Sequence, residues 1–293
     1  MRFPTLLAQH TFIICLLTIS ASNLFASQSV IIESDGYACM GEDKSRKQTE
    51  QSAVADAKRK ATESAVSYIT SETHLKDAML EKDLLSAYSR AQVKQLQELM
   101  KEWYKDAGIG DCYRVKLKVE VIPDEKALAT LSGKGQEALE SSPSAPLSVK
   151  LWSDKSDYRQ GEKIRIYLKG NKPFFAKVVY KDAQGEQVQL LPNPHRKNNY
   201  FNGGVVYELP SGEDRFDLEV SPPFGLENLT VYASTSELGE LSVTANNAVY
   251  AIKNKSDEVA SGTRGVKLTS KGSGGKNQTA EFSESSQTIR TNP

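Results

Sequence analysis

The side chains that most often perform catalysis are few and widely separated in this sequence. Beyond residue 26 the chain contains two histidines, His74 and His195, more than a hundred residues apart. A hydrolase needs a nucleophile, a base and an orienting acid in contact, and a metal site needs clustered His, Cys, Asp or Glu. The sequence contains no Gly-x-Ser-x-Gly turn, Walker loop or dinucleotide fingerprint. We therefore expect no catalytic residue, metal ion or cofactor, and we expect each histidine to be a surface or capping residue.

Binding is the main alternative to catalysis, and the polar and aromatic segment 191–201 is one candidate for it. His195, Arg196 and Tyr200 lie in this segment, and loops at the ends of β-sandwiches commonly carry recognition. A glycan or a protein could bind there. The alternative, which we favour, is a solvated connection whose Tyr200 and Phe201 pack into the core.

Two further aromatic residues, Trp152 and Tyr158, flank the first turn of the same predicted domain. Together they could form a flat platform for a sugar ring. Aromatic side chains so close to a strand more often anchor the core of a sandwich, because their large apolar area is buried there. Trp152 and Tyr158 are therefore possible ligand-binding residues, with core anchoring as the more frequent outcome.

The first 26 residues have the three parts of an export signal. A short segment carries Arg2, an apolar run covers residues 11–19, and small residues follow, which places cleavage after Ala26. The run is shorter than the roughly 20 residues that span a bilayer, and no basic cluster flanks it. Cys15 lies inside the run behind large apolar residues, which is not the pattern of a lipoprotein. We expect a soluble periplasmic or secreted product with no integral membrane segment after cleavage.

Removal of the signal leaves two of the three cysteines, Cys39 and Cys112. An even pair in an oxidising compartment indicates one structural disulfide. The bond would enclose residues 40–111, a loop for which the chain-entropy model gives a stabilisation of roughly 4 kcal/mol. A redox-active or metal-binding pair is the alternative, but it would require Cys-x-x-Cys spacing or nearby histidines.

Length and charge restrict the class of protein further. Removing 26 of the 293 residues leaves enough chain for two ordinary domains, each with a core. The chain carries 37 basic and 37 acidic residues, and loss of Arg2 with the signal changes this balance by one. Such neutrality gives no electrostatic reason to expect nucleic acid or an anionic membrane as a partner.

The segment 27–124 changes from strand to helix to strand, which predicts an α+β domain. A β-rich run begins at Ser29, and residues 43–68 then carry an alanine-rich stripe at helical spacing. Residues 80–91 continue with a second helical pattern, and residues 113–121 alternate apolar with charged side chains as a strand does. Between them, residues 92–104 keep a helical period but run into a glycine-rich turn, so a third helix and a hairpin both remain possible.

The rest of the chain reads as a linker, an all-β domain and a tail. Residues 125–146 are polar and contain one short helical pattern, which indicates a linker. Residues 147–269 contain short strands punctuated by turns, typical of a β-sandwich or barrel. Residues 270–293 have few apolar side chains, so we expect a disordered tail. The expected strands are 148–152, 163–169, 174–180, 187–191, 204–209, 216–220 and 229–234.

A second set of patterns in the N-terminal part lies in residues 34–38, 53–61, Ala65, 102–104 and 113–121. Through these residues the N-terminal part resembles a module shared by envelope lipoproteins and FlgT-like flagellar assembly proteins. In that family a strand leads into an alanine-rich helix that packs on a small antiparallel sheet, which favours the hairpin for residues 92–104. The likeness covers about ninety residues and is a helix pattern rather than a chemical signature.

The C-terminal part contains a series of short motifs at residues 151–155, 158–162, 189–193, 203–210, 216–220 and 222–227. Through these motifs it resembles domain of unknown function 4384. They occur in the family's order, so this is the more specific likeness. It implies a bacterial envelope setting but no activity, and it also implies a late strand at residues 263–268.

These observations together predict a noncatalytic, exported cell-envelope protein that acts as an interaction or assembly module. Its partner would be an envelope protein or a glycan that the sequence does not identify. A periplasmic carbohydrate- or peptidoglycan-binding module is the first alternative. An undetected hydrolase is the least supported one, because histidine is scarce and no nucleophile motif is present.

Overall fold

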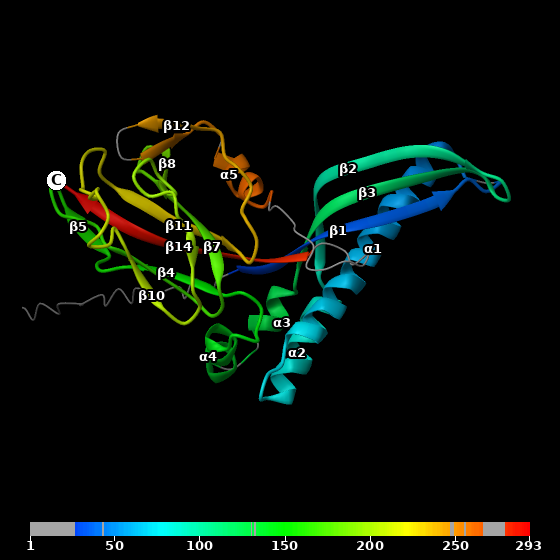
Figure 1. Cartoon of the computed structure of the whole chain (residues 1–293), viewed down its shortest axis with the longest axis horizontal. Helices are drawn as coiled ribbons and strands as arrows, with labels where there is room; N and C mark the ends of the chain where they lie inside the picture. The colour runs from blue at the N-terminus through cyan, green and yellow to red at the C-terminus, as the bar shows by residue number, and fades with distance from the viewer. Residues whose placement is uncertain are drawn as a thin grey trace, which may run out of the picture.

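A computed structural model describes residues 27–42, 44–129, 131, 133–246, 249–254, 256–265 and 279–293. The predicted export signal and residues 270–278 of the predicted tail lie outside these ranges. The chain has a mixed α+β fold, in which a helical N-terminal part precedes a mainly antiparallel sheet that curls like a sandwich (Figure 1). This agrees with the fold class predicted from the sequence.

The N-terminal part consists of two helices and three strands. Ser45 begins the first helix with a capping box, in which its hydroxyl accepts from the Gln48 backbone N–H and the Gln48 side chain accepts from the Ser45 N–H. Asp77 caps the second helix by accepting from two backbone N–H groups. The elements are β1 (Ser27–Cys39), α1 (Arg46–Glu72), α2 (Ala78–Ser89), β2 (Gln92–Asp106) and β3 (Gly110–Ile122).

Residues 92–104 belong to a hairpin, not to a third helix. β2 pairs antiparallel with β3 and has register irregularities between Gln95 and Gln97 and between Glu98 and Met100. Each irregularity shifts the side-chain alternation of the strand. The partly buried positions of β2 therefore recur every three or four residues, which explains the helix-like spacing in the sequence.

The alanine stripe of α1 packs on the sheet. Ala53, Ala57, Ala61 and Ala65 are fully buried against β1 and β3. Contact is closest at Gly36, where an added Cβ would lie 2.1 Å from the Ala53 carbonyl oxygen. Small side chains on the helix and a glycine on the strand thus allow the two backbones to approach closely.

The chain then crosses to the C-terminal part through α3 (Glu125–Ala129) and α4 (Gly133–Ser141). The end of this connection is packed, since Ala145 and Leu147 are fully buried. The side-chain amide of Asn171 donates to the carbonyl oxygens of Ser142, at 2.8 Å, and Pro146, at 3.0 Å. Its Oδ1 accepts from the Ser148 backbone, so this one buried amide fixes the path of the connection.

The N-terminal strands and most C-terminal strands form one large sheet, and in the C-terminal part this sheet faces a small one. The large sheet has the order β12-β13-β8-β7-β11-β14-β1-β3-β2, and the small sheet has the order β10-β6-β4. Their facing sides enclose the main apolar core. The elements are β4 (Val149–Ser153), β5 (Asp157–Arg159), β6 (Ile166–Gly170), β7 (Phe174–Lys181), β8 (Gln187–Leu191), β9 (Tyr200–Phe201), β10 (Val206–Leu209), β11 (Leu226–Ser234), β12 (Val243–Asn246), β13 (Val249–Ile252), α5 (Ser256–Thr263) and β14 (Thr279–Asn292).

Two predictions for the end of the chain were wrong. Thr279–Asn292, expected to be disordered, forms β14, which lies between β1 and β11 inside the large sheet (Figure 1). The strand expected at residues 263–268 is not found where it can be checked, because Thr263 ends α5, and residues 266–268 lie outside the described part. Residues 216–220, also expected to form a strand, make only a bridge between Glu219 and Lys163.

Polar side chains of β14 bond to the backbone at the edge of β4, where the described part of the chain pairs no further strand of the small sheet. Glu281 accepts from the backbone N–H of Leu147, just before β4, at 2.6 Å. Within β4, Ser283 accepts from the N–H of Val149 and Gln287 accepts from the N–H of Ser153, both at 3.1 Å. Each pair is 134 residues apart. Buried backbone groups need such partners, so polar residues here stabilise the corner between the sheets.

Candidate functional site

Tyr158 is a core residue and not part of a sugar platform. Its side chain is fully buried, its hydroxyl donates to the Asp154 carboxylate at 2.7 Å, and the Lys155 backbone N–H donates to it at 3.2 Å. Burial raises the pKa of Tyr158 to about 12. Trp152 does not contact it, because Trp152 lies on the opposite, outer face of the small sheet. The structure therefore separates these two predicted residues.

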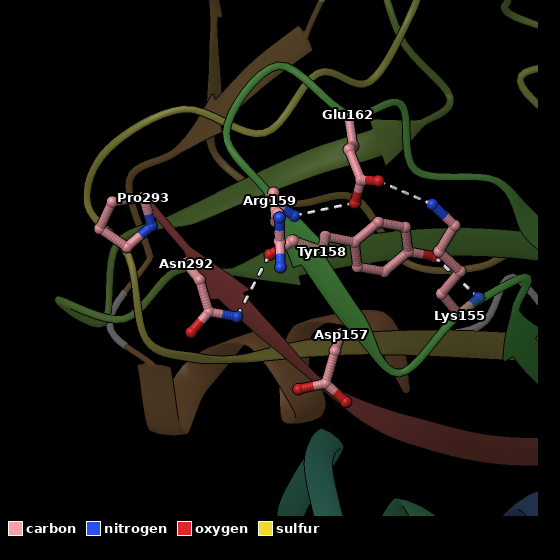
Figure 2. A pocket seen from close by; sticks show the side chains of 7 residues that line it. All are labelled: Lys155, Asp157, Tyr158, Arg159, Glu162, Asn292 and Pro293. Carbon is pink, nitrogen blue, oxygen red and sulfur yellow. Dashed lines mark hydrogen bonds and ion pairs between the residues drawn. The ribbon is translucent and has the colours of Figure 1, made fainter.

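A surface pocket of about 500 Å³ lies beside Tyr158 (Figure 2). Two of its charged groups, Lys155 and Glu162, are bonded to each other. Lys155 donates to Glu162 at 2.9 Å, and the other oxygen of Glu162 accepts from the Arg159 backbone at 2.8 Å. Asn292 donates to the Tyr158 carbonyl oxygen at 3.3 Å. No histidine, cysteine or serine lines this pocket, and its two carboxylates are those of Asp157 and Glu162.

The segment 191–201 is held in place by one buried amide. The Asn193 side chain accepts from the backbone of His195 and of Arg196, both at 2.8 Å, and donates to the Leu190 carbonyl oxygen at 2.7 Å. His195 itself is exposed. Arg196 forms an ion pair with Asp214 at 2.9 Å. The loop is thus a fixed turn whose arginine is already neutralised.

The two aromatic residues that end this segment differ. Phe201 is buried and its ring lies 5.6 Å from the Arg196 guanidinium. Tyr200 stays 48% exposed, with its ring 5.0 Å from that of Phe175. We favoured the interpretation that Tyr200 and Phe201 both pack into the core. It is correct for Phe201 and wrong for Tyr200. His74, the remaining histidine of the described chain, is exposed in the connection between α1 and α2.

Cys39 and Cys112 are joined in a disulfide, as predicted. They are opposite each other in the register of β1 and β3, with their Cα atoms 3.9 Å apart. The bond ties the far end of the strand pair next to the β2–β3 turn, so its position indicates a structural role.

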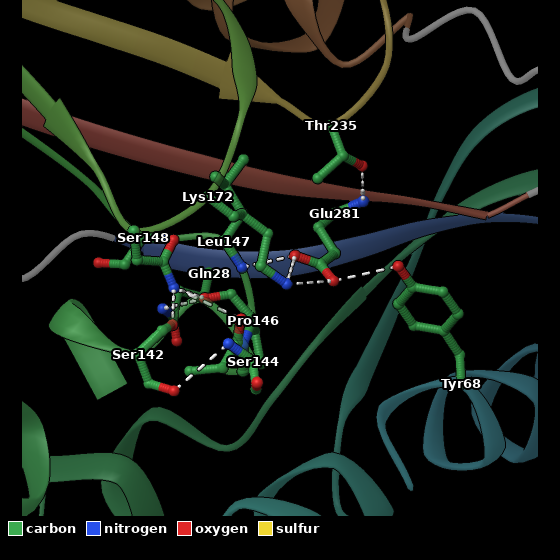
Figure 3. Close-up of polar contacts among 12 residues, drawn as sticks. Gln28, Tyr68, Ser142, Ser144, Pro146, Leu147, Ser148, Lys172, Thr235 and Glu281 are labelled. Atoms are coloured by element: carbon green, nitrogen blue, oxygen red, sulfur yellow. Dashed lines mark hydrogen bonds and ion pairs between the residues drawn. The ribbon is translucent and has the colours of Figure 1, made fainter. Parts of the chain in front are cut away.

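Two clusters of buried charged groups, centred on Glu281 and on Arg264, were not predicted from the sequence. The Glu281 cluster consists of Tyr68, Leu147, Lys172 and Glu281 (Figure 3). Lys172 and Glu281 form an ion pair at 3.0 Å, and the Tyr68 hydroxyl donates to Glu281 at 3.0 Å. Burial and then the Glu281 charge raise the pKa of Tyr68. One carboxylate thereby joins α1, the connection before β4, the β6–β7 turn and β14.

The Arg264 cluster consists of Ser29, Glu120, Arg264 and Glu284. Arg264 follows α5 and pairs with Glu120 of β3 and Glu284 of β14, both at 2.8 Å. Ser29 of β1 donates to Glu120 at 2.7 Å. The partners in both clusters are far apart along the chain, so no local pattern could have revealed them.

The remaining candidate is the outer face of the small sheet, defined by Lys150, Trp152, Tyr167, Lys169, Val206 and Glu208. Trp152 and Tyr167 are opposite each other in the β4–β6 register, with nearly parallel rings whose centroids are 5.6 Å apart. Tyr167 was missed as a site residue. The alternation of residues 164–169, which predicts one wet side, was the signal that could have found it.

In the described parts of the chain, no group of three or more His, Cys, Asp or Glu could hold a metal ion. No helix there is long and apolar enough to cross a membrane.

Comparison with known proteins finds one family. Residues 157–237 match the model of a domain of unknown function, DUF4384, which agrees with the resemblance of the C-terminal part. No curated protein and no solved structure matches the chain, and nothing in these comparisons supports the FlgT-like resemblance of the N-terminal part. The matched residues run from β5 to just beyond β11, so β4 and β14, which complete the sandwich, lie outside the matched range.

Proposed function

We propose that this chain is a noncatalytic, exported protein of the bacterial cell envelope that acts as an interaction or assembly module. The observation that carries the proposal is the use of the buried charges. Glu281 and Arg264 each connect an element of the N-terminal part to elements of the C-terminal part. A catalytic site would instead direct such groups into a cavity.

This arrangement gives a rigid molecule with an exposed surface at each end. The N-terminal strands and the sandwich share one sheet through the β1–β14 pairing. Apolar side chains remain exposed at both ends, with Ile109 in the β2–β3 turn 63% exposed and Val206 on the small sheet 52% exposed. A module that holds two surfaces at fixed separation suits assembly. The envelope setting is part of the proposal, and the predicted export signal and the resemblance to DUF4384 support it.

Site-specific photo-crosslinking in cells tests this function. A photoreactive residue is placed at Ile109, at Val206 or at the buried control Leu84, which is fully enclosed in the N-terminal core. We expect an exposed position to give one reproducible adduct with an envelope component in the periplasmic or secreted fraction, and the control to give none. Absence of adducts from both exposed positions in stably produced protein, or recovery of the protein in the cytoplasm, would overturn the proposal.

A hydrolase remains testable in the same material. The substitution Glu162→Gln is made in the Tyr158 pocket. It removes the carboxylate that accepts from both Lys155 and the Arg159 backbone. We expect no turnover on a broad panel of ester, peptide and glycoside substrates. Turnover that Glu162→Gln abolishes would contradict a noncatalytic role.

A further inference from the structure

The outer face of the small sheet combines aromatic and basic side chains. Residues of β4 and β6 alternate strictly, so Val149, Leu151, Ile166 and Leu168 face the core and their neighbours face outward. Register places Trp152 beside Tyr167 and Lys150 beside Lys169. The face therefore has an aromatic row next to a basic row.

The aromatic row is not required by the core. Tyr158 and Phe174 are fully buried, as expected for aromatic residues of a sandwich, and they lie on the inner side. Trp152 and Tyr167 are only partly buried on the outer side. Aromatic side chains with accessible ring surface are suited to bind another molecule, because they offer a large contact area at low cost in conformational entropy.

The charges of this face favour an anionic ligand. Lys150 pairs with Glu140, and Arg165, which lies just before β6, pairs with Glu208, so both of these cations are neutralised. Lys169 forms no ion pair with the residues that the structure describes, and it is exposed. An exposed lysine beside the aromatic row thus leaves a positive charge on a chain that is neutral overall.

We propose that the outer face binds an acidic polysaccharide, with a sugar ring against Trp152 and Tyr167 and a carboxylate at Lys169. A sugar ring presents C–H groups on one side, which match the negative face of an aromatic ring. Its hydroxyl groups suit the surrounding charged side chains. A protein partner is less well matched, because the centres of protein interfaces are depleted in lysine. This inference rests on the proposed function, whose interaction surface it names.

Binding to defined sugars tests the proposal. The mature full-length chain is titrated calorimetrically with oligogalacturonate and with a neutral gluco-oligosaccharide of equal length, and is tested for retention on purified peptidoglycan sacculi. We expect saturable binding of the acidic probe, at least tenfold tighter than of the neutral one and weakened by salt, because salt screens exposed charges. Retention on sacculi would indicate that peptidoglycan carboxylates are the natural source.

Three variants locate the site. We expect Trp152→Ala and Tyr167→Ala each to weaken binding of the acidic probe at least tenfold, and Lys169→Glu to weaken it selectively over the neutral probe. Lys169→Glu alters only an exposed side chain, so it tests the site even if the aromatic variants fold poorly. Tyr200→Ala, an exposed aromatic residue outside the outer face, is the control and should bind normally.

The outcomes separate this inference from the proposed function. No saturable binding of either probe or of sacculi would overturn the glycan site, and so would binding that all three variants leave unchanged. If glycan binding fails while Val206 crosslinks to an envelope protein, the face is a protein interface and the proposed function stands. If glycan binding succeeds, the adduct at Val206 should be reduced by excess oligogalacturonate.

Discussion

Gly36 and the Lys172–Glu281 pair show how single residues determine the tolerance of this fold. At Gly36 the constraint is space, because the backbones of β1 and α1 are in direct contact there. At Lys172 the constraint is charge, because its partner Glu281 is almost fully buried. Both constraints arise from tertiary contact, although each depends on a single residue.

The first prediction concerns Gly36→Ala. The new Cβ would lie 2.1 Å from the Ala53 carbonyl oxygen and 2.5 Å from the Ala57 nitrogen, so helix and strand must separate. We expect the free energy of unfolding in urea to fall by about 2–3 kcal/mol. Gly41→Ala is the matched control, since nothing lies within 4 Å of its added Cβ. Equal effects of the two substitutions would contradict close packing at Gly36.

The second prediction concerns the buried ion pair. Lys172→Met leaves the Glu281 carboxylate buried without its cation, and we expect the free energy of unfolding to fall by about 3 kcal/mol. Lys163→Met breaks an exposed pair with Asp217, whose side chains are 59% and 62% exposed, and should cost below about 1 kcal/mol. Urea unfolding of both variants provides the comparison, and similar losses would show that burial does not distinguish the two pairs.

At the scale of elements, β14 is the strand on which the others depend. It pairs with β1 on one side and β11 on the other, and its side chains bond the edge of β4. Its polar side chains can be buried because backbone groups elsewhere in the chain form hydrogen bonds with them. A central strand can therefore have the composition of a disordered tail.

The third prediction is that β14 cannot be removed. Deletion of residues 279–293 would expose the edges of β1, β11 and β4 at once, so we expect loss of the cooperative unfolding transition in circular dichroism. Deletion of Pro293 alone, which lies beyond β14, should leave the transition intact. A truncated chain that unfolds with an unchanged midpoint would restore the interpretation of this segment as a disordered tail.

The fourth prediction concerns the pairing of β1 with β3. We expect the double variant Cys39→Ser, Cys112→Ser to lose roughly 4 kcal/mol in urea unfolding, because the crosslink no longer restricts the unfolded chain. Intact mass after alkylation checks the starting state. Two modified thiols in the oxidised wild-type protein would show that the disulfide is absent.

At the scale of the whole molecule, the predicted domains 27–124 and 147–269 are connected by more than a linker. They share a sheet through β1 and β14, and the Glu281 and Arg264 clusters connect them further. Contacts of this kind make separate unfolding costly, because opening the junction would leave charges and strand edges unpaired.

The fifth prediction uses the two tryptophans of the chain as separate reporters. Trp103 lies in β2 and Trp152 lies in β4, so Trp103→Phe and Trp152→Phe each leave one reporter, in opposite parts of the molecule. For each single-tryptophan variant, we expect the urea midpoint from tryptophan fluorescence to equal the midpoint from circular dichroism, which reports the whole molecule. If the two midpoints differ in either variant, the two parts unfold independently.

Much of the N-terminal part and several sandwich strands follow from local pattern. Alternation in residues 113–121 and the alanine stripe of α1 indicated elements that the structure contains, and an even cysteine pair predicted the disulfide. Periodicity reports that one side of an element is buried, but not what covers it. Where irregular register changed the period, as in β2, the pattern was ambiguous for that reason.

By itself, the sequence determined the α+β order and the disulfide. Only the tertiary structure decided that β14 is central, that Lys172 meets Glu281 across 109 residues, and that Trp152 lies beside Tyr167 and not Tyr158. The physical reason is range. Helical stripes and strand alternation are set by neighbours within a few residues, whereas strand register and buried charge pairs depend on which distant segments share a sheet.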